Sequence, residues 1–124
     1  MEKKRIHTDD APAAIGPYSQ AIDLGNVIFT SGQIPVAPDG SVSSDISQQT
    51  RQALLNLKAV VEAGGSSFDK VIKTTVFITD MAQFGAINAV YSEFFTEPYP
   101  ARSCVQVAAL PKGVSIEIEA IALK

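Results

Sequence analysis

The pattern of hydrophobic and polar positions changes its period along the chain, and each change marks a predicted element. The first structured segment is predicted from about Tyr18 to Ser31. The β-type runs at 22–24 and 27–30 indicate two strands, and Gly25-Asn26 between them is typical of a turn, so this segment predicts a hairpin. Residues 33–44 carry prolines and an Asp-Gly pair, which predict an irregular loop.

Two helices are predicted from apolar residues that recur at helical spacing. The first begins after Asp45, a good N-cap with Gln48 in the position of a capping box, and it ends at Gly64-Gly65, which favour a left-handed C-cap. Its apolar face consists of Ile46, Ala53, Leu54, Leu57, Val60 and Val61. The second begins after Asp80 and its apolar side contains Phe84, Ile87, Tyr91 and Phe94 or Phe95.

Three further strands complete the predicted fold. Residues 71–79 are rich in β-branched side chains and predict a strand buried over much of both faces. Two closing strands are predicted at about 102–110 and 114–123, separated by Pro111-Lys112-Gly113. The order β-β-α-β-α-β-β predicts an α+β domain in which two helices pack on one face of a single sheet. The other face needs a cover, which self-association would provide.

Composition narrows the class of protein. The chain has 124 residues, of which 46% are hydrophobic and 19% are charged, and this fits one globular domain over residues 1–124. The net charge of −3 disfavours binding to nucleic acid. With Cys104 as the one cysteine and His7 as the one histidine, an internal disulfide, a Cys-rich or His-cluster metal site and most Ser-His-Asp arrangements are excluded. No apolar run approaches the roughly 18 residues of a membrane span, so a soluble cytoplasmic protein is expected.

The charged residues of the last two predicted strands are the first candidates for chemistry. Arg102 begins a strand of small apolar residues, and its planar fork suits a carboxylate; a surface salt bridge is the alternative. Glu117 and Glu119 share one strand face. They form either a half-solvated face or a carboxylate site that positions a water molecule and transfers protons.

The spacing of these strands bears on whether the two charges share a site. If the last two strands pair as a simple hairpin, Arg102 and Glu117 lie about five residues, or roughly 16 Å, apart along the ladder. One ligand could then bridge them only across a subunit boundary or if the strands are not adjacent.

Further candidates surround this pair. Cys104 lies on the face of Arg102 and is interpreted as a small buried hydrophobe rather than a nucleophile, because no histidine follows it. Ser31-Gly32 ends a strand where glycine lets a ligand approach the backbone. Tyr18 lines the same pocket or belongs to the core, and Asn88 lies on the second helix. No phosphate-binding loop is present.

Several segments of the chain resemble the Rid family, and within it the RidA type of reactive intermediate (enamine/imine) deaminases. The resemblance covers nearly the whole chain and is carried by residues 13–21, 30–35, 100–105, 110–114 and 116–120, among them Pro100-Ala101-Arg102-Ser103 and Glu117. It implies a chorismate-mutase-like α+β fold and a homotrimer with sites between subunits. It also implies hydrolysis of 2-imino acids, such as 2-iminobutanoate and 2-iminopropanoate, to 2-oxo acids and ammonia, without cofactor or metal.

The resemblance also implies a role for each candidate residue. Arg102 would hold the substrate carboxylate, assisted by the N–H groups of Gly32 and Cys104. Glu117 would orient the attacking water with help from Ser31, and Tyr18 and Asn88 would line the pocket.

Two other functions remain open at this point. A small-ligand-binding regulatory or chaperone-like trimer would use the same arginine to bind a 2-oxo acid without reaction. An endoribonuclease or translation inhibitor, a role reported in the family, is disfavoured by the net charge and the single histidine.

Overall fold

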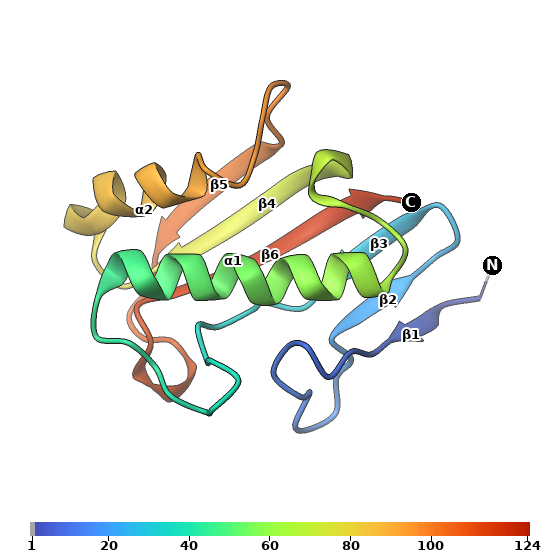
Figure 1. Cartoon of the computed structure of the whole chain (residues 1–124), viewed down its shortest axis with the longest axis horizontal. Coiled ribbons are helices and arrows are strands. Elements are labelled where there is room, and N and C mark those ends of the chain that lie inside the picture. The colour runs from blue at the N-terminus through green and yellow to red at the C-terminus, as the bar shows by residue number, and fades with distance from the viewer. Residues whose placement is uncertain (1) are drawn as a thin grey trace.

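A computed structural model describes residues 2–124 as one mixed sheet with two helices (Figure 1). Its strands are β1 (Lys4–Ile6), β2 (Ala21–Asp23), β3 (Val27–Thr30), β4 (Val71–Ile78), β5 (Ala101–Gln106) and β6 (Ile116–Leu123). The helices are α1 (Ile46–Ala63) and α2 (Phe84–Tyr91), and short 3-10 turns cover 68–70, 81–83 and 111–113. The strands lie in the order β1-β2-β3-β6-β4-β5, and every neighbouring pair is antiparallel except β4 and β5.

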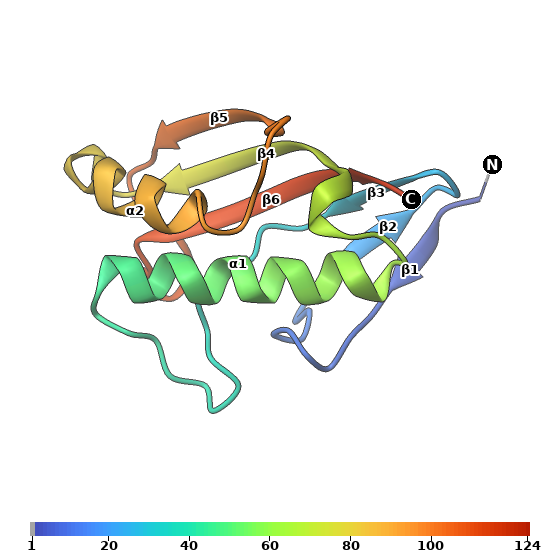
Figure 2. The same ribbon diagram turned by 45° about the horizontal axis from the view of Figure 1, so that its top comes forward.

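Both helices lie on the same face of the sheet, which is clear in the turned view of Figure 2. On β6 the side chains that point toward α1 are fully or almost fully buried: Ile116, Ile118, Ala120 and Ala122. The alternate residues of the same strand are only half-buried. The predicted α+β class, with one sheet and two helices on one face, is confirmed, and the opposite face is uncovered in the single chain.

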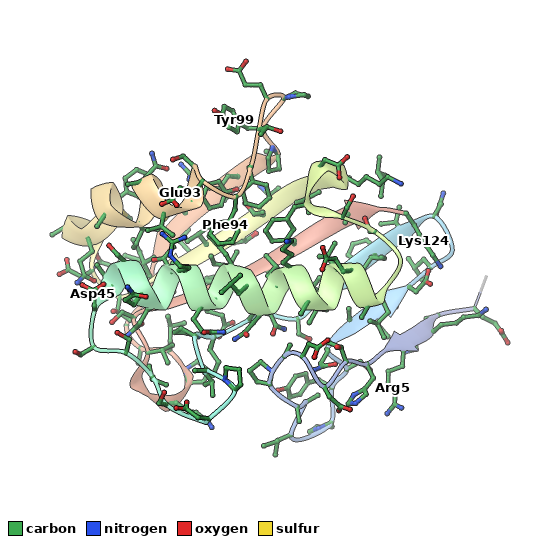
Figure 3. All side chains as sticks on the ribbon, viewed as in Figure 1. Arg5, Asp45, Glu93, Phe94, Tyr99 and Lys124 are labelled. Carbon is green, nitrogen blue, oxygen red and sulfur yellow. The ribbon has the colours of Figure 1, made fainter. Side chains whose placement is uncertain are left out.

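The ends of α1 follow the predicted capping signals. Asp45, at the start of the helix in Figure 3, accepts a hydrogen bond from the Gln48 N–H at 2.9 Å. At the other end the N–H groups of Gly65 and Ser66 donate to the carbonyls of Glu62 and Val61. This pattern is a Schellman motif in which Gly65, at φ +88°, is the left-handed residue.

Several predicted boundaries were wrong, for local reasons. The sheet begins before Tyr18, because the short β1 adds an edge strand that three residues cannot signal by periodicity. The strand β4 is buried on one face only, since Thr75 and Phe77 are half-buried on the other. The segment after Asp80 first forms a 3-10 turn at 81–83, and α2 ends at Tyr91. Phe94 and Phe95 therefore reach the core from the loop after α2.

The two closing strands do not pair as a hairpin. β4 lies between β5 and β6, parallel to β5 and antiparallel to β6, so β4, α2 and β5 form a β-α-β crossover. β5 ends at Gln106 rather than near Leu110. The condition for the 16 Å hairpin separation of Arg102 and Glu117 is therefore not met.

The Schellman motif provides a test of the fold in solution. Gly65→Ala should lower the free energy of unfolding by about 1 kcal/mol, because a Cβ is strained at the positive φ of this residue. Gly85→Ala is the matched control: Gly85 lies within α2 and a Cβ there meets no atom within 4 Å, so this change should stabilise by about 0.5 kcal/mol. Urea unfolding at one fixed protein concentration measures both, and equal effects of the two changes would contradict the C-cap assignment.

Candidate functional site

Arg102 lies on the edge strand β5 with its guanidinium directed at α2. In the β4–β5 ladder it is the partner of Thr74, which is fully buried beneath the helices. Its Nη1 donates to Asn88 Oδ1 at 2.8 Å. Its Cζ lies 4.7 Å from the ring centre of Tyr91 and 5.4 Å from that of Phe84. Within residues 2–124 no carboxylate lies within ion-pair distance of Arg102, so the surface salt bridge considered as the alternative is not formed.

The spacing of three α2 residues produces this arrangement. Phe84, Asn88 and Tyr91 follow one another at intervals of four and three, which places them on one face of a helix. That face is turned to β5, as the contacts of all three with Arg102 show. The sequence assigned Phe84 and Tyr91 to the apolar core; the polar Asn88 between them was the signal that this face also meets a charged group.

Cys104 lies on the same side of β5, half-buried and packed against the core. Burial raises the pKa of its thiol, although the charge of Arg102 acts in the opposite direction. The side chain thus fits the small hydrophobe expected from the sequence. The direction of the Cys104 backbone N–H follows from a hydrogen bond just after the end of β5, where the Val107 N–H donates to the Ile78 carbonyl of β4 at 2.8 Å. By alternation along the strand, the N–H of Cys104 points away from β4, toward the open edge of the sheet.

Glu117 lies on the opposite face of the sheet. Its neighbours on β6, Ile116 and Ile118, are buried beneath the helices, and Glu117 and Glu119 are half-buried on the uncovered face, as alternation predicted. Burial raises the pKa of the Glu117 carboxyl above its ordinary value, and the charge of Glu119 on the same face adds to this shift.

Gly32 provides the surface against which the Glu117 carboxylate lies. A Cβ at Gly32 would stand only 2.1 Å from the Oε2 of Glu117, so this close approach requires glycine. The two segments are held together by Gln33, the residue after Gly32, and Ile118, the residue after Glu117. The N–H groups of Gln33 and Ile118 donate to each other's carbonyls at 2.8 and 3.1 Å. The Gly32 N–H has no acceptor among residues 2–124.

Ser31 and Tyr18 lie beside this group. The Ser31 hydroxyl donates to the Ser19 carbonyl at 2.6 Å, and the Ser31 N–H donates to the Gln20 carbonyl. Both residues line a shallow depression of about 400 Å³ together with Pro17, Ile22 and Phe29. Tyr18 is 53% exposed, so the alternative of a core tyrosine is wrong.

The candidate residues therefore form two separate groups in one chain. The arginine group consists of Asn88, Arg102 and Cys104 on the helix side of β5, and the glutamate group consists of Tyr18, Ser31, Gly32 and Glu117. Thr74 on β4 is the ladder partner of both Arg102 on β5 and Ala120 on β6. Ala120 is three residues from Glu117 along β6. Two strand spacings, about 10 Å, separate β5 from β6, and the two side chains point to opposite faces. Although β5 and β6 are not adjacent, one small ligand cannot contact both groups within a single subunit.

The one histidine lies outside both groups. His7 is exposed, and its Nε2 lies 3.0 Å from Asp9 Oδ1. Within residues 2–124, no cluster of three or more His, Cys, Asp or Glu side chains has the arrangement of a metal site. In the same part of the chain, neither helix has the length and apolar character needed to cross a membrane.

Comparison with known proteins identifies the family. Residues 8–124 match the sequence model of the family described as endoribonuclease L-PSP. A RutC family protein of Pasteurella multocida is 60% identical over 126 residues, and the 2-iminobutanoate/2-iminopropanoate deaminase of Escherichia coli is 58% identical over 125 residues; both alignments cover 98% of each chain. The crystal structure of E. coli TdcF with bound serine superimposes with a TM-score of 0.93, at 56% identity over 98% of both chains. The chain belongs to this family, the Rid family that its motifs indicated, and it has the Rid fold.

The electrostatic coupling on the open face can be measured directly. Glu119→Gln removes a negative charge beside Glu117 and should lower the pKa of Glu117 toward its ordinary value, though only in part, because burial is the larger cause. A pH titration of the glutamate carboxyl resonances by NMR, assigned with Glu117→Gln, measures the shift. Glu93→Gln removes the same charge on the helix side, where Glu93 is paired with Arg51, and should leave the Glu117 pKa unchanged. Equal shifts in the two variants would contradict the coupling.

Proposed function

We propose that this protein is a 2-imino acid deaminase, which hydrolyses small imines such as 2-iminobutanoate and 2-iminopropanoate to 2-oxo acids and ammonia. The observation that carries the proposal is the Arg102 guanidinium, which has no carboxylate partner within residues 2–124 and is held by Asn88 and two aromatic rings. The E. coli deaminase, which is 58% identical over 98% of both chains, supports the reaction. The serine bound to E. coli TdcF supports a small ligand with a carboxylate.

Arg102 binds the substrate carboxylate. One of its N–H groups is used by Asn88, and the remaining donors of the fork are enough for a two-point contact with a carboxylate. The outward N–H of Cys104 and the unpaired N–H of Gly32 are further donors. This anchor fixes the position of the imine carbon relative to the protein.

Hydrolysis then needs a positioned water molecule and a group that carries protons. Glu117 accepts a proton from the water as the water oxygen bonds to the carbon of the protonated imine, while the C=N electron pair moves to nitrogen. The protonated Glu117 gives this proton to the amine nitrogen. Glu117 then takes the proton of the new hydroxyl group as the C=O bond forms and the C–N bond breaks, so that ammonia and the 2-oxo acid are released and the last proton passes from Glu117 to ammonia or solvent. The pKa of Glu117, raised by burial and by the charge of Glu119, makes its carboxylate a better proton acceptor than an ordinary glutamate. The Ser31 hydroxyl, which donates to Ser19, has lone pairs free to accept from the water.

The complete site is proposed to form between subunits of a homotrimer. Each subunit would contribute its arginine group to one neighbour and its glutamate group to the other. The uncovered face of the sheet supports this assembly, because it exposes apolar side chains that a partner would bury: Ile22, Phe29, Phe77, Val105 and Ile121.

Endoribonuclease activity has weaker support. The family description contains that word. However, the net charge is −3, and the single histidine is exposed and paired with Asp9. These features provide neither a basic groove nor paired proton carriers for RNA cleavage.

An imine hydrolysis assay tests the reaction and both principal residues. Threonine dehydratase generates 2-iminobutanoate and semicarbazide traps what remains. Arg102→Ala should lower kcat/KM about 100-fold through loss of the charge-assisted carboxylate contact. Glu117→Gln should lower kcat about 100-fold or more with 2-oxobutanoate binding retained, and it should abolish the rise of wild-type activity with pH through the Glu117 pKa. Wild type that binds 2-oxobutanoate but never reduces semicarbazone formation would instead support the ligand-binding trimer.

Mixing two inactive variants tests the intersubunit site. Trimers reassembled from Arg102→Ala and Glu117→Gln subunits contain one interface at which both residues are intact, so up to about a third of the sites should recover activity. Reassembling each variant with itself is the control and should recover none. If the mixture stays inactive although mass spectrometry detects mixed trimers, the two residues do not act across a subunit boundary.

A further inference from the structure

The guanidinium of Arg102 is held by a residue that has no contact with the glutamate group. Tyr91 is 6% exposed, and its ring centre lies 4.7 Å from the Arg102 Cζ. A cation over an aromatic face at this distance is attracted by the ring and takes a preferred position. Tyr91 takes no part in the proposed chemical steps, and its contact is with Arg102.

The position of this ring is itself fixed by β4, the strand beside β5. The Tyr91 hydroxyl lies 2.7 Å from the Oγ1 of Thr74, a fully buried residue on β4. Thr74 is the ladder partner of Arg102, so the hydroxyl that holds the ring and the arginine that lies over it occupy the same level of the sheet. The ring also packs against that of Phe95, with 4.7 Å between the two ring centres.

This hydroxyl pair is unusual for the core in which it lies. Its neighbours are apolar, among them Val76, Ile87 and Phe95, and a Val at 74 with a Phe at 91 would fill nearly the same volume without polar atoms. The pair does supply direction, because a hydrogen bond holds the end of the ring at one place on β4.

We propose that Tyr91 is a positioning residue that sets the plane of the Arg102 guanidinium for the ligand carboxylate. Asn88 sets its rotation within that plane through the Nη1 contact. The inference rests on the proposed function, since a carboxylate ligand is what the guanidinium is positioned for.

The physical advantage is pre-organisation. A free arginine side chain has many rotamers, and ordering it on binding weakens affinity. Here the ring face of Tyr91 and one in-plane acceptor restrict two independent rotations before the ligand arrives, and Phe84 lies 5.4 Å from the same Cζ. The remaining N–H donors therefore keep one orientation.

The test measures affinity for 2-oxobutanoate, the unreactive product, by calorimetry, and KM and kcat for the imine in parallel. Tyr91→Leu removes the ring and should weaken 2-oxobutanoate binding and raise KM about tenfold, with kcat within about twofold of wild type. Phe68→Leu is the matched control: Phe68 stacks on Phe95 in the same core at 4.7 Å. It should lower thermal stability and leave affinity unchanged.

A second comparison separates positioning from stability. Tyr91→Phe keeps the ring but leaves the Thr74 hydroxyl without its partner, so both stability and affinity should fall, the affinity about threefold. Adding Thr74→Val to Tyr91→Phe should restore thermal stability but not affinity, because the ring is still no longer held at β4.

The proposal is overturned if Tyr91→Leu binds 2-oxobutanoate as tightly as wild type, or if affinity follows thermal stability through the whole series, Phe68→Leu included. Failure of the proposed function is a different result. If wild type binds 2-oxobutanoate through Arg102 but hydrolyses no imine, the affinity series still decides the role of Tyr91. If Arg102→Ala binds as wild type does, the positioning proposal fails together with the assigned carboxylate anchor.

Discussion

The two faces of the sheet differ because the chain supplies helices for only one of them. On β4 and β6 alternate side chains enter the core beneath α1 and α2, and the intervening ones lie on an uncovered surface. This alternation makes Ile116, Ile118 and Ala120 core residues and leaves Glu117 and Glu119 on the open face. A carboxylate could not have been placed on the helix side without burying an unpaired charge in the core. The chemistry of the chain is divided between the faces for this reason.

The positive charge of Arg102 lies on the helix side of the sheet without entering the core, because β5 is an edge strand. β5 has no neighbour beyond it, so the Arg102 side chain on its helix-facing side extends along α2 to Asn88 rather than into the core. Arg102 is half-buried in this position and lies against two rings, which take up its apolar surface while leaving its N–H donors accessible. Central strands offer no such place. An arginine at the level of Thr74 on β4 would be buried without a partner.

The sequence predicted what depends on neighbours along the chain. The caps of α1 at Asp45 and Gly65 are local hydrogen-bonding problems, and the face shared by Glu117 and Glu119 follows from the strand period alone. The pairing of β5 with β4 was not predictable in this way, because the residues near Arg102 in the sequence do not determine which distant strand pairs with β5. The roles of Thr74 and Tyr91 were missed for the same reason. In the sequence Thr74 fits a β-branched strand pattern and Tyr91 fits an apolar helix face. The hydrogen bond between them becomes visible only in the folded structure, where β4 and α2 are packed together.

The division between faces has a consequence for proton transfer in the proposed trimer. Glu117 is only half-buried in the single chain, yet its pKa is already raised by burial and by Glu119. A partner that covers the open face would remove more water from this carboxylate and raise its pKa further, toward the range in which it can both accept and return a proton at neutral pH. The same partner would bring an arginine whose charge is free for the substrate. When bound, the substrate carboxylate would neutralise that arginine and so limit its opposite effect on Glu117. Association would thus complete the proposed site and raise the pKa of its base in one step, and the proposed hydrolysis would then need neither a nucleophilic side chain nor a histidine.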